Sequence, residues 1–243
     1  MTQPWVKYVL LAVALLALSA CAAVSPGEQL ARAIERMESL QTVHFEMRGA
    51  VRADSPFPEQ QPAGGAVKQD VRAWGDIAFP DRLHLFALTA SEAEPPREFI
   101  VVGQRVWAKI GGEWRRIART TNQTDPRAAL DVLRGPGEVR HAGYGLNGGT
   151  LTYHLRVVLD EAALAERQRR RGDSLAQQLV GTGRLDVFIG VFDGRIYRQE
   201  VEIVERSGTE LTGGSGLFRI RTSYAVDYSG FDAQREIRPP DGG

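Results

Sequence analysis

The stretch that runs from Phe218 to Tyr228 reads FRIRTSYAVDY and indicates the fold class. Aromatic and β-branched residues alternate in it with small or polar ones, which is the period-two pattern of a strand with one dry face and one wet face. Just upstream, the runs 185–192 and 195–204 flank Asp193-Gly194, a dipeptide that favours the tight turn of a hairpin. The last third of the chain is therefore predicted to be antiparallel sheet.

The middle of the chain repeats this pattern. Residues 43–48 alternate strictly, residues 150–158 form a further strand-like run, and residues 66–118 resemble a series of hairpins. Within that series, Gly103-Gln104 and Gly111-Gly112 separate short apolar runs. Turns this tight force neighbouring strands to be antiparallel, so we expect one continuous sheet of about ten strands.

Helical spacing occurs in only three segments: 28–40, 125–133 and 160–180. The first is amphipathic and follows Ser25-Pro26-Gly27-Glu28, the pattern of a capping box with proline at the first helical position. The third has a polar middle, and Gly172-Asp173 can divide it. Few helices and one dry face per strand predict an α+β protein built on a single curved antiparallel sheet.

Composition and charge exclude several classes of protein. The chain has 243 residues, of which 43% are hydrophobic, and its 30 basic residues balance 30 acidic ones. These values argue against disorder and against a multi-span membrane protein, and the zero net charge gives no reason to expect a nucleic-acid partner. One cysteine and four histidines leave little material for a disulfide or a metal site. We expect no cofactor and no metal.

The first residues have the pattern of an export signal. Lys7 precedes the apolar run Tyr8–Leu18, which is shorter than the roughly 20 residues that span a bilayer. The run ends in Leu18-Ser19-Ala20-Cys21, which resembles the lipobox of bacterial lipoproteins. That resemblance implies that residues 1–20 are removed, that Cys21 is acylated, and that the protein lies outside the cytoplasm, anchored to a bacterial membrane. An ordinary secretory signal with a chance cysteine is the alternative.

The expected tether between anchor and body is short. The division is residues 1–20 as signal, 21–25 as lipidated cysteine and tether, and 26–240 as one folded domain. Four peptide steps separate Cys21 from Ser25 and reach roughly 13 Å when extended. A body held this closely lies near the lipid headgroups.

The sequence offers little for catalysis, and we expect no enzyme. It has no Gly-x-Ser-x-Gly elbow, and the lone cysteine is assigned to the lipid. His44, His84 and His154 are interpreted as isolated surface residues, and Gly213-Gly214-Ser215-Gly216 as a β-turn.

An arginine run marks the third helical segment. It comprises Arg167, Arg169, Arg170 and Arg171. One interpretation is a solvated helix face. The other is contact with anionic headgroups, worth ~1 kcal/mol per residue near the surface.

The dry faces of the strands are the candidate binding surface. The set comprises Val43, Phe45, Met47, Leu83, Leu85, Val101, Val187, Ile189, Tyr197, Val201, Phe218, Ile220 and Tyr224. Such residues are either plain core or the lining of a lipid cavity. A sheet this wide exposes more concave apolar area than a few modest helices readily cover, so the excess is closed by curvature or filled by a ligand.

The order of elements resembles the LppX/LprG-type lipoproteins, which have the LolA-like fold. Four stretches carry the similarity: Ala33–Phe45, Phe99–Trp114, Leu185–Val204, and Val226–Phe231 with the closing Ile237–Pro240. The resemblance implies an unclosed half-barrel with helices on its concave face and lipid acyl chains between the two. It brings no catalytic residues with it.

Two hypotheses follow. The first is a membrane-anchored lipoprotein that binds lipid or another amphiphile in an apolar cavity, for lipid transport or transfer. The second is an envelope sensor or protein-interaction module with the same fold and no lipid cargo. The protein is expected to be a monomer, and the sequence identifies no protein partner.

Overall fold

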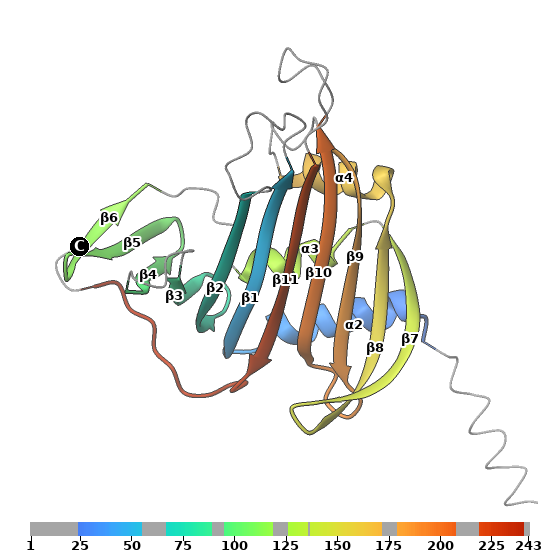
Figure 1. Ribbon diagram of the computed structural model, residues 1–243. Coiled ribbons are helices and arrows are strands. Elements are labelled where there is room, and N and C mark those ends of the chain that lie inside the picture. Colours follow the sequence, from blue (N-terminus) through green and yellow to red (C-terminus); the bar gives the residue numbers. More distant parts are fainter. Residues whose placement is uncertain are drawn as a thin grey trace, which may run out of the picture.

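The computed structural model describes residues 24–54, 67–88, 95–118, 126–135, 137–171, 179–207 and 219–240. Within these ranges, eleven strands form one antiparallel sheet that does not close, and three helices lie on one of its faces (Figure 1). The predicted α+β class with an unclosed half-barrel is therefore confirmed.

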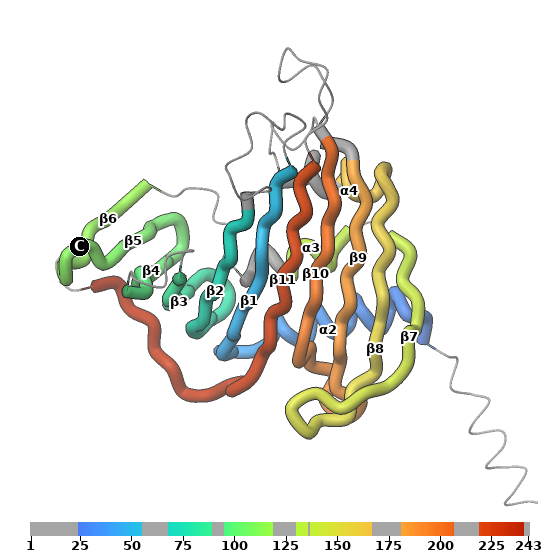
Figure 2. The backbone as a smooth tube through the Cα atoms, in the orientation of Figure 1, coloured from blue at the N-terminus to red at the C-terminus, as the bar shows by residue number. Residues whose placement is uncertain are grey.

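The sheet consists of two meanders that meet at the first and last strands. The order is β6-β5-β4-β3-β2-β1-β11-β10-β9-β8-β7, so β6 and β7 are its edges (Figure 2). The first meander comprises β1 (Thr42–Asp54), β2 (Val67–Ala78), β3 (Arg82–Leu88), β4 (Arg97–Val102), β5 (Arg105–Ile110) and β6 (Glu113–Ile117). The second comprises β7 (Glu138–Asn147), β8 (Thr150–Leu159), β9 (Leu179–Gly190), β10 (Ile196–Ser207) and β11 (Arg219–Ser229).

The pairing of β1 with β11 joins the two halves along their full length. Phe45 lies opposite Tyr228, and Gly49 lies opposite Tyr224. Beyond β11, Asp232 fixes the start of β1, since its carboxylate accepts from the Gln41 amide at 2.9 Å and its own amide donates to the Thr42 carbonyl at 2.8 Å. The chain then returns to the first meander, where Arg82 donates to the carbonyl of Ile237 at 3.1 Å.

Helix α2 (Pro26–Glu38) begins at the predicted capping box. The Ser25 hydroxyl accepts from the Glu28 amide at 3.3 Å, and the Glu28 carboxylate accepts from the Ser25 amide at 3.0 Å. Its apolar face is buried, and that face comprises Leu30, Ala33, Ile34 and Met37. The helix crosses the concave face and packs against β7 and β10.

The other two helices lie on the same face of the sheet (Figure 1). Helix α3 (Pro126–Leu133) buries Leu130, Val132 and Leu133, and α4 (Glu161–Arg171) buries Ala163 and Leu164. Helix α4 packs mainly against β9. It is shorter than the predicted helical segment 160–180, because Leu179 and Val180 already belong to β9.

Candidate functional site

The concave face of the sheet is a continuous apolar core. Nine of the thirteen predicted lining residues lie in it at 6% exposure or less. They are Val43, Phe45, Met47, Leu83, Leu85, Val101, Val187, Ile189 and Val201. The buried faces of the three helices belong to the same core. The strand alternation therefore brought these side chains together as expected, and whether they ever contact lipid stays a prediction.

Two further predicted residues lie on the same face of β11. Ile220 and Tyr224 are half-buried, and Tyr224 packs against the core. Glycine at position 49 permits this packing, because a Cβ there would lie 2.5 Å from the Ser223 carbonyl oxygen and 2.6 Å from the Tyr224 Cβ. Tyr224 thus lies opposite Gly49, where β1 and β11 leave no room for a Cβ.

Tyr197 departs from the pattern expected of β10. A register shift between Ile196 and Arg198 breaks the alternation, so that Ile196 is the buried residue. The Tyr197 hydroxyl instead donates to the Asp193 carboxylate at 2.9 Å, and its ring meets the edge of Phe231 at 5.1 Å. Tyr197 stabilises the β9–β10 turn and is not part of the core cluster.

Three of the sequence-based predictions fall outside the described part of the chain. Cys21 and Phe218 lie outside the described residues. The four arginines at 167, 169, 170 and 171 lie on α4, but their side chains lie outside the described part as well. Helix α4 connects the end of β8 to the start of β9, so it lies at that end of these two strands.

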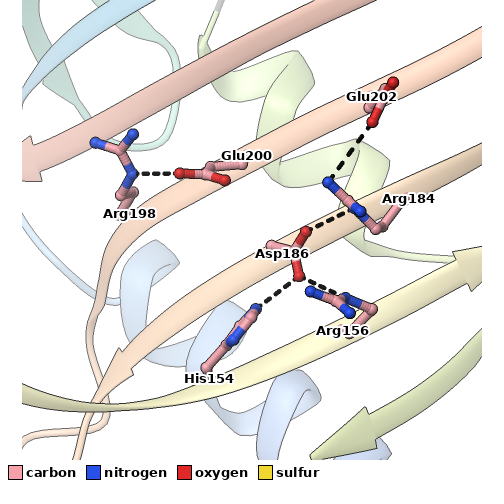
Figure 3. A network of polar contacts seen from close by, with 7 residues as sticks. All are labelled: His154, Arg156, Arg184, Asp186, Arg198, Glu200 and Glu202. Atoms are coloured by element: carbon pink, nitrogen blue, oxygen red, sulfur yellow. Dashed lines mark hydrogen bonds and ion pairs between the residues drawn. The ribbon is translucent and has the colours of Figure 1, made fainter. Parts of the chain in front are cut away.

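The convex face carries a polar network centred on Asp186 (Figure 3). The Asp186 side chain is only 5% exposed, and its carboxylate accepts from His154 Nε2 at 2.6 Å and from Arg156 Nε at 2.8 Å. Arg184 pairs with the second oxygen at 2.9 Å and reaches Glu202 at 3.6 Å. Burial opposes ionisation of Asp186, but the hydrogen bonds from Arg156 and His154 outweigh it and lower the pKa of this carboxyl.

The other two histidines that were expected to be isolated, His44 and His84, are also paired, which corrects that expectation. His44 lies 2.8 Å from the carboxylate of Asp76, and His84 lies 2.9 Å from that of Glu98. Burial again opposes ionisation of Glu98, while hydrogen bonds from His84 and Lys109 lower its pKa. No pattern in the sequence predicts these pairs, because each joins residues on two strands whose register is unknown beforehand. The pairs stabilise the convex face, and no catalytic arrangement emerges from them.

Two hollows are lined by described residues, one over the sheet and one between the sheet and a helix. One of about 230 Å³ lies over β1 and β2 and is bordered by Arg48, Arg72 and Trp74. The other, about 580 Å³, lies between the β7–β8 pair and α4 and is bordered by Glu138, Asp160 and Glu166 among others. The smaller hollow has charged walls, which suits a solvated surface. The larger one combines its three carboxylates with the apolar side chains of Val158, Ala162 and Ala163.

The described ranges lack two features. No group of three or more histidine, cysteine, aspartate or glutamate side chains in them is placed to hold a metal ion. None of their helices combines the length and the apolar character needed to cross a membrane.

Comparison with known proteins identifies the fold. No protein-family description and no curated protein matches the sequence. Among solved structures, the Mycobacterium tuberculosis lipoprotein LppX aligns over 88% of this chain and 98% of its own, at 15% identity and a TM-score of 0.50. LprF from Mycobacterium bovis aligns over 88% and 96%, at 15% identity and a TM-score of 0.47. A LolA-superfamily protein from Nitrosomonas europaea covers 90% and 96%, at 12% identity and a TM-score of 0.29.

The chain therefore has a LolA-like fold of the LppX/LprG type, as the order of its elements predicted.

Proposed function

We propose that this protein is an extracytoplasmic lipoprotein, anchored through Cys21, that binds lipid or another amphiphile between its sheet and its helices. Its role is to carry or transfer that amphiphile. The fold supports this proposal, because LppX, which has the same fold, is itself a lipoprotein. The protein acts as a binding protein, with no chemical step.

The observation that carries the proposal is the unbroken apolar concave face beneath α2 in a sheet that is not closed. Leu30, Ile34 and Met37 of α2 belong to the same core cluster as Phe45 and Val187. An acyl chain has the same apolar character as the α2 face. It can therefore take the place of that face without exposing the core to water.

The transfer free energies favour exchange of an acyl chain between membrane and protein over its net capture by the protein. Moving a methylene from water to an apolar phase is worth ~0.8 kcal/mol, and the gain is nearly the same in a bilayer and in this core. The protein gains little affinity over the membrane from such contacts. Its effect is to give the acyl chain a dry route between two apolar phases.

The interaction module remains the second candidate. The observation that favours it is the tight packing of the core, in which Phe45, Leu85 and Ile189 are each 0% exposed. A core that never opens leaves only the outer surfaces for binding.

The test uses the mature protein extracted from its own membrane in mild detergent. Native mass spectrometry measures the mass of co-purified amphiphile. Tyr224→Asp places a charge on the concave face of β11, and Ser223→Asp places the same charge on the exposed convex face of that strand. We expect the wild type and Ser223→Asp to carry an amphiphile and Tyr224→Asp to lose it while keeping its circular dichroism spectrum.

A second measurement covers the case in which Tyr224→Asp does not fold. Wild-type protein is irradiated with a diazirine-labelled fatty acid, and the labelled peptides are sequenced. Labelling of the peptide that contains Phe45 supports binding at the concave face. A wild type that carries no amphiphile and is labelled on no concave strand contradicts the proposal.

A further inference from the structure

We infer that two neighbouring hairpin ends of the second meander insert into the lipid bilayer. The surface, called here the apolar rim, lies at the β7–β8 and β9–β10 connections. Its side chains are exposed to the following fractions: Tyr144 71%, Leu146 78%, Leu151 40%, Val191 38% and Phe192 89%. The inference concerns where the body contacts the membrane, and it rests on the anchoring in the proposed function but not on the cargo.

The rim is a contiguous surface. Leu146 lies opposite Leu151 in the β7–β8 pair, and the Val191 amide donates to the Leu151 carbonyl at 3.0 Å. Seven large hydrophobic residues of the described ranges are exposed, and five of them belong to the rim. Single exposed apolar residues are ordinary on a protein surface, whereas a cluster marks an interaction site.

The rim continues the concave face outward from the core. Along β8 the side chains on that face change from Leu155 at 0% exposure, through half-buried Tyr153, to Leu151 at 40%. On β9, Ile189 is 0% exposed, and Val191, in the turn just after the strand, is 38% exposed. The apolar rows of neighbouring strands thus reach the end of the sheet together, where an amphiphile that leaves a bilayer first meets the protein.

The absence of charge favours a bilayer as the occupant. Residues 142–153 read AGYGLNGGTLTY and contain no charged residue, although 25% of the chain is charged. The nearby Asp193 accepts from the Arg195 amide at 3.2 Å and from the Tyr197 hydroxyl. Tyrosine at the edge of such a surface suits the water–lipid interface, since its ring is apolar and its hydroxyl is polar.

The tether places the anchor on the same side of the molecule. Helix α2 begins beside the lower half of β7 in Figure 1, and β7 runs down into the rim. Because the chain from Cys21 to Ser25 spans roughly 13 Å at most, an acyl group on Cys21 keeps this edge of the sheet close to the membrane.

When the hairpin ends insert and the strands stand upright on the bilayer, the arginine helix does not reach the same bilayer surface. The rim lies at the start of β8, and α4 follows its end, ten residues later. At about 3.3 Å per residue, the two surfaces are roughly 30 Å apart. The predicted headgroup contact of the α4 arginines is therefore an alternative to the rim.

The experiment measures the depth of each surface in the membrane. Acylated mature protein is reconstituted into phosphatidylcholine vesicles that carry nitroxide quenchers. An environment-sensitive dye is attached to Phe192→Cys, and the control dye to Ile110→Cys, which is 49% exposed at the β5–β6 turn. The only natural cysteine is Cys21, whose thiol is blocked by the lipid, so each label is specific.

We expect the dye at Phe192 to shift to the blue and to be quenched at a depth of roughly 5–10 Å, while the dye at Ile110 stays in water. Charge reversal of Arg167 and Arg169 should leave the Phe192 signal unchanged. Equal quenching at both labels overturns the inference, and so does a blue shift without vesicles, which indicates a protein contact. Loss of the signal on charge reversal assigns the contact to α4 instead. Cargo is measured separately by mass spectrometry, so the rim and the lipid-binding proposal fail independently.

Discussion

Replacing Asp186 by asparagine tests whether the convex network stabilises the sheet. The substitution keeps the size of the side chain and removes its charge. In the wild type this carboxylate is 5% exposed and contacts His154, Arg156 and Arg184 within 2.9 Å. The variant leaves the two arginines without their shared partner on the surface of β8 and β9.

The expected loss is about 2–3 kcal/mol in the free energy of unfolding. A hydrogen bond to a charged group contributes roughly 1.5–3 kcal/mol, and two such bonds are lost. The sum is discounted because the Arg156 and Arg184 side chains are 41% and 51% exposed and regain water.

The effect depends on pH in a defined direction. The folded-state pKa of Asp186 is lowered from its ordinary value of 3.8, so the unfolded chain takes up the proton first on acidification. The stabilisation is therefore fully present above about pH 5 and is lost as the pH falls through the folded-state pKa. The difference between wild type and Asp186→Asn should shrink in the same range.

Urea unfolding followed by circular dichroism at pH 7 and at acidic pH measures both quantities. The matched control is Glu46→Gln, which removes a carboxylate from the same convex face. The Glu46 side chain is 49% exposed and pairs with an Arg48 that is 67% exposed, so its loss should cost less than about 1 kcal/mol. If Asp186→Asn unfolds at the same urea concentration as Glu46→Gln at pH 7, the reasoning is refuted.

Three further substitutions, each measured by thermal or urea unfolding, test the close strand approach at Gly75 and the start of α2. Gly75→Ala should cost about 3 kcal/mol or prevent folding, because its Cβ would lie 2.8 Å from the Leu85 Cα and closer still to the His84 carbonyl; unchanged stability would contradict the close β2–β3 approach. Ser25→Ala should cost about 1 kcal/mol through loss of the α2 cap. Gly27→Ala, with nothing within 4 Å of its Cβ, should instead be neutral or stabilise by up to about 1 kcal/mol, and a loss there would show that α2 is already strained.

Local signals in the sequence predicted much of the fold. The capping box at Ser25 fixed the start of α2, and glycine turns such as Gly103-Gln104 and Gly111-Gly112 fixed the hairpins of the first meander. These signals work because the backbone conformation at a cap or a tight turn depends on a few adjacent residues. The alternation of β1 and β11 likewise placed the concave side chains correctly.

Strand β7 was missed, and its chemistry explains why. Glu138–Asn147 contains Gly143 and Gly145, and its apolar side chains are mostly exposed, so it shows no alternation of dry and wet residues. An edge strand pairs on one side only and here extends past the core. The sequence feature that could have indicated this strand is the uncharged stretch 142–153. A search for alternating apolar and polar residues does not detect it.

The convex network was also beyond the reach of sequence analysis. Asp186 lies between the buried residues Leu185 and Val187, and its two β8 partners are about thirty positions away in the chain. Only the register of β8 on β9, which sets Arg156 opposite Asp186, brings them together. The prediction that Tyr197 lines the concave face was wrong for a related reason. One extra residue in a strand reverses the alternation of its side chains.

Apolar excess in the sequence is weak support for a cavity. The alternation predicts more concave apolar area than the helices readily cover, but nine of the predicted lining residues are at most 6% exposed. Three helices bury these residues, and α2 contributes Leu30, Ile34 and Met37 to the shared core. Lipid binding must therefore compete with this packing. Because a helix face and an acyl chain bury similar apolar surface, the outcome depends on how stably α2 is packed on the sheet. The capping box at Ser25 contributes to that stability.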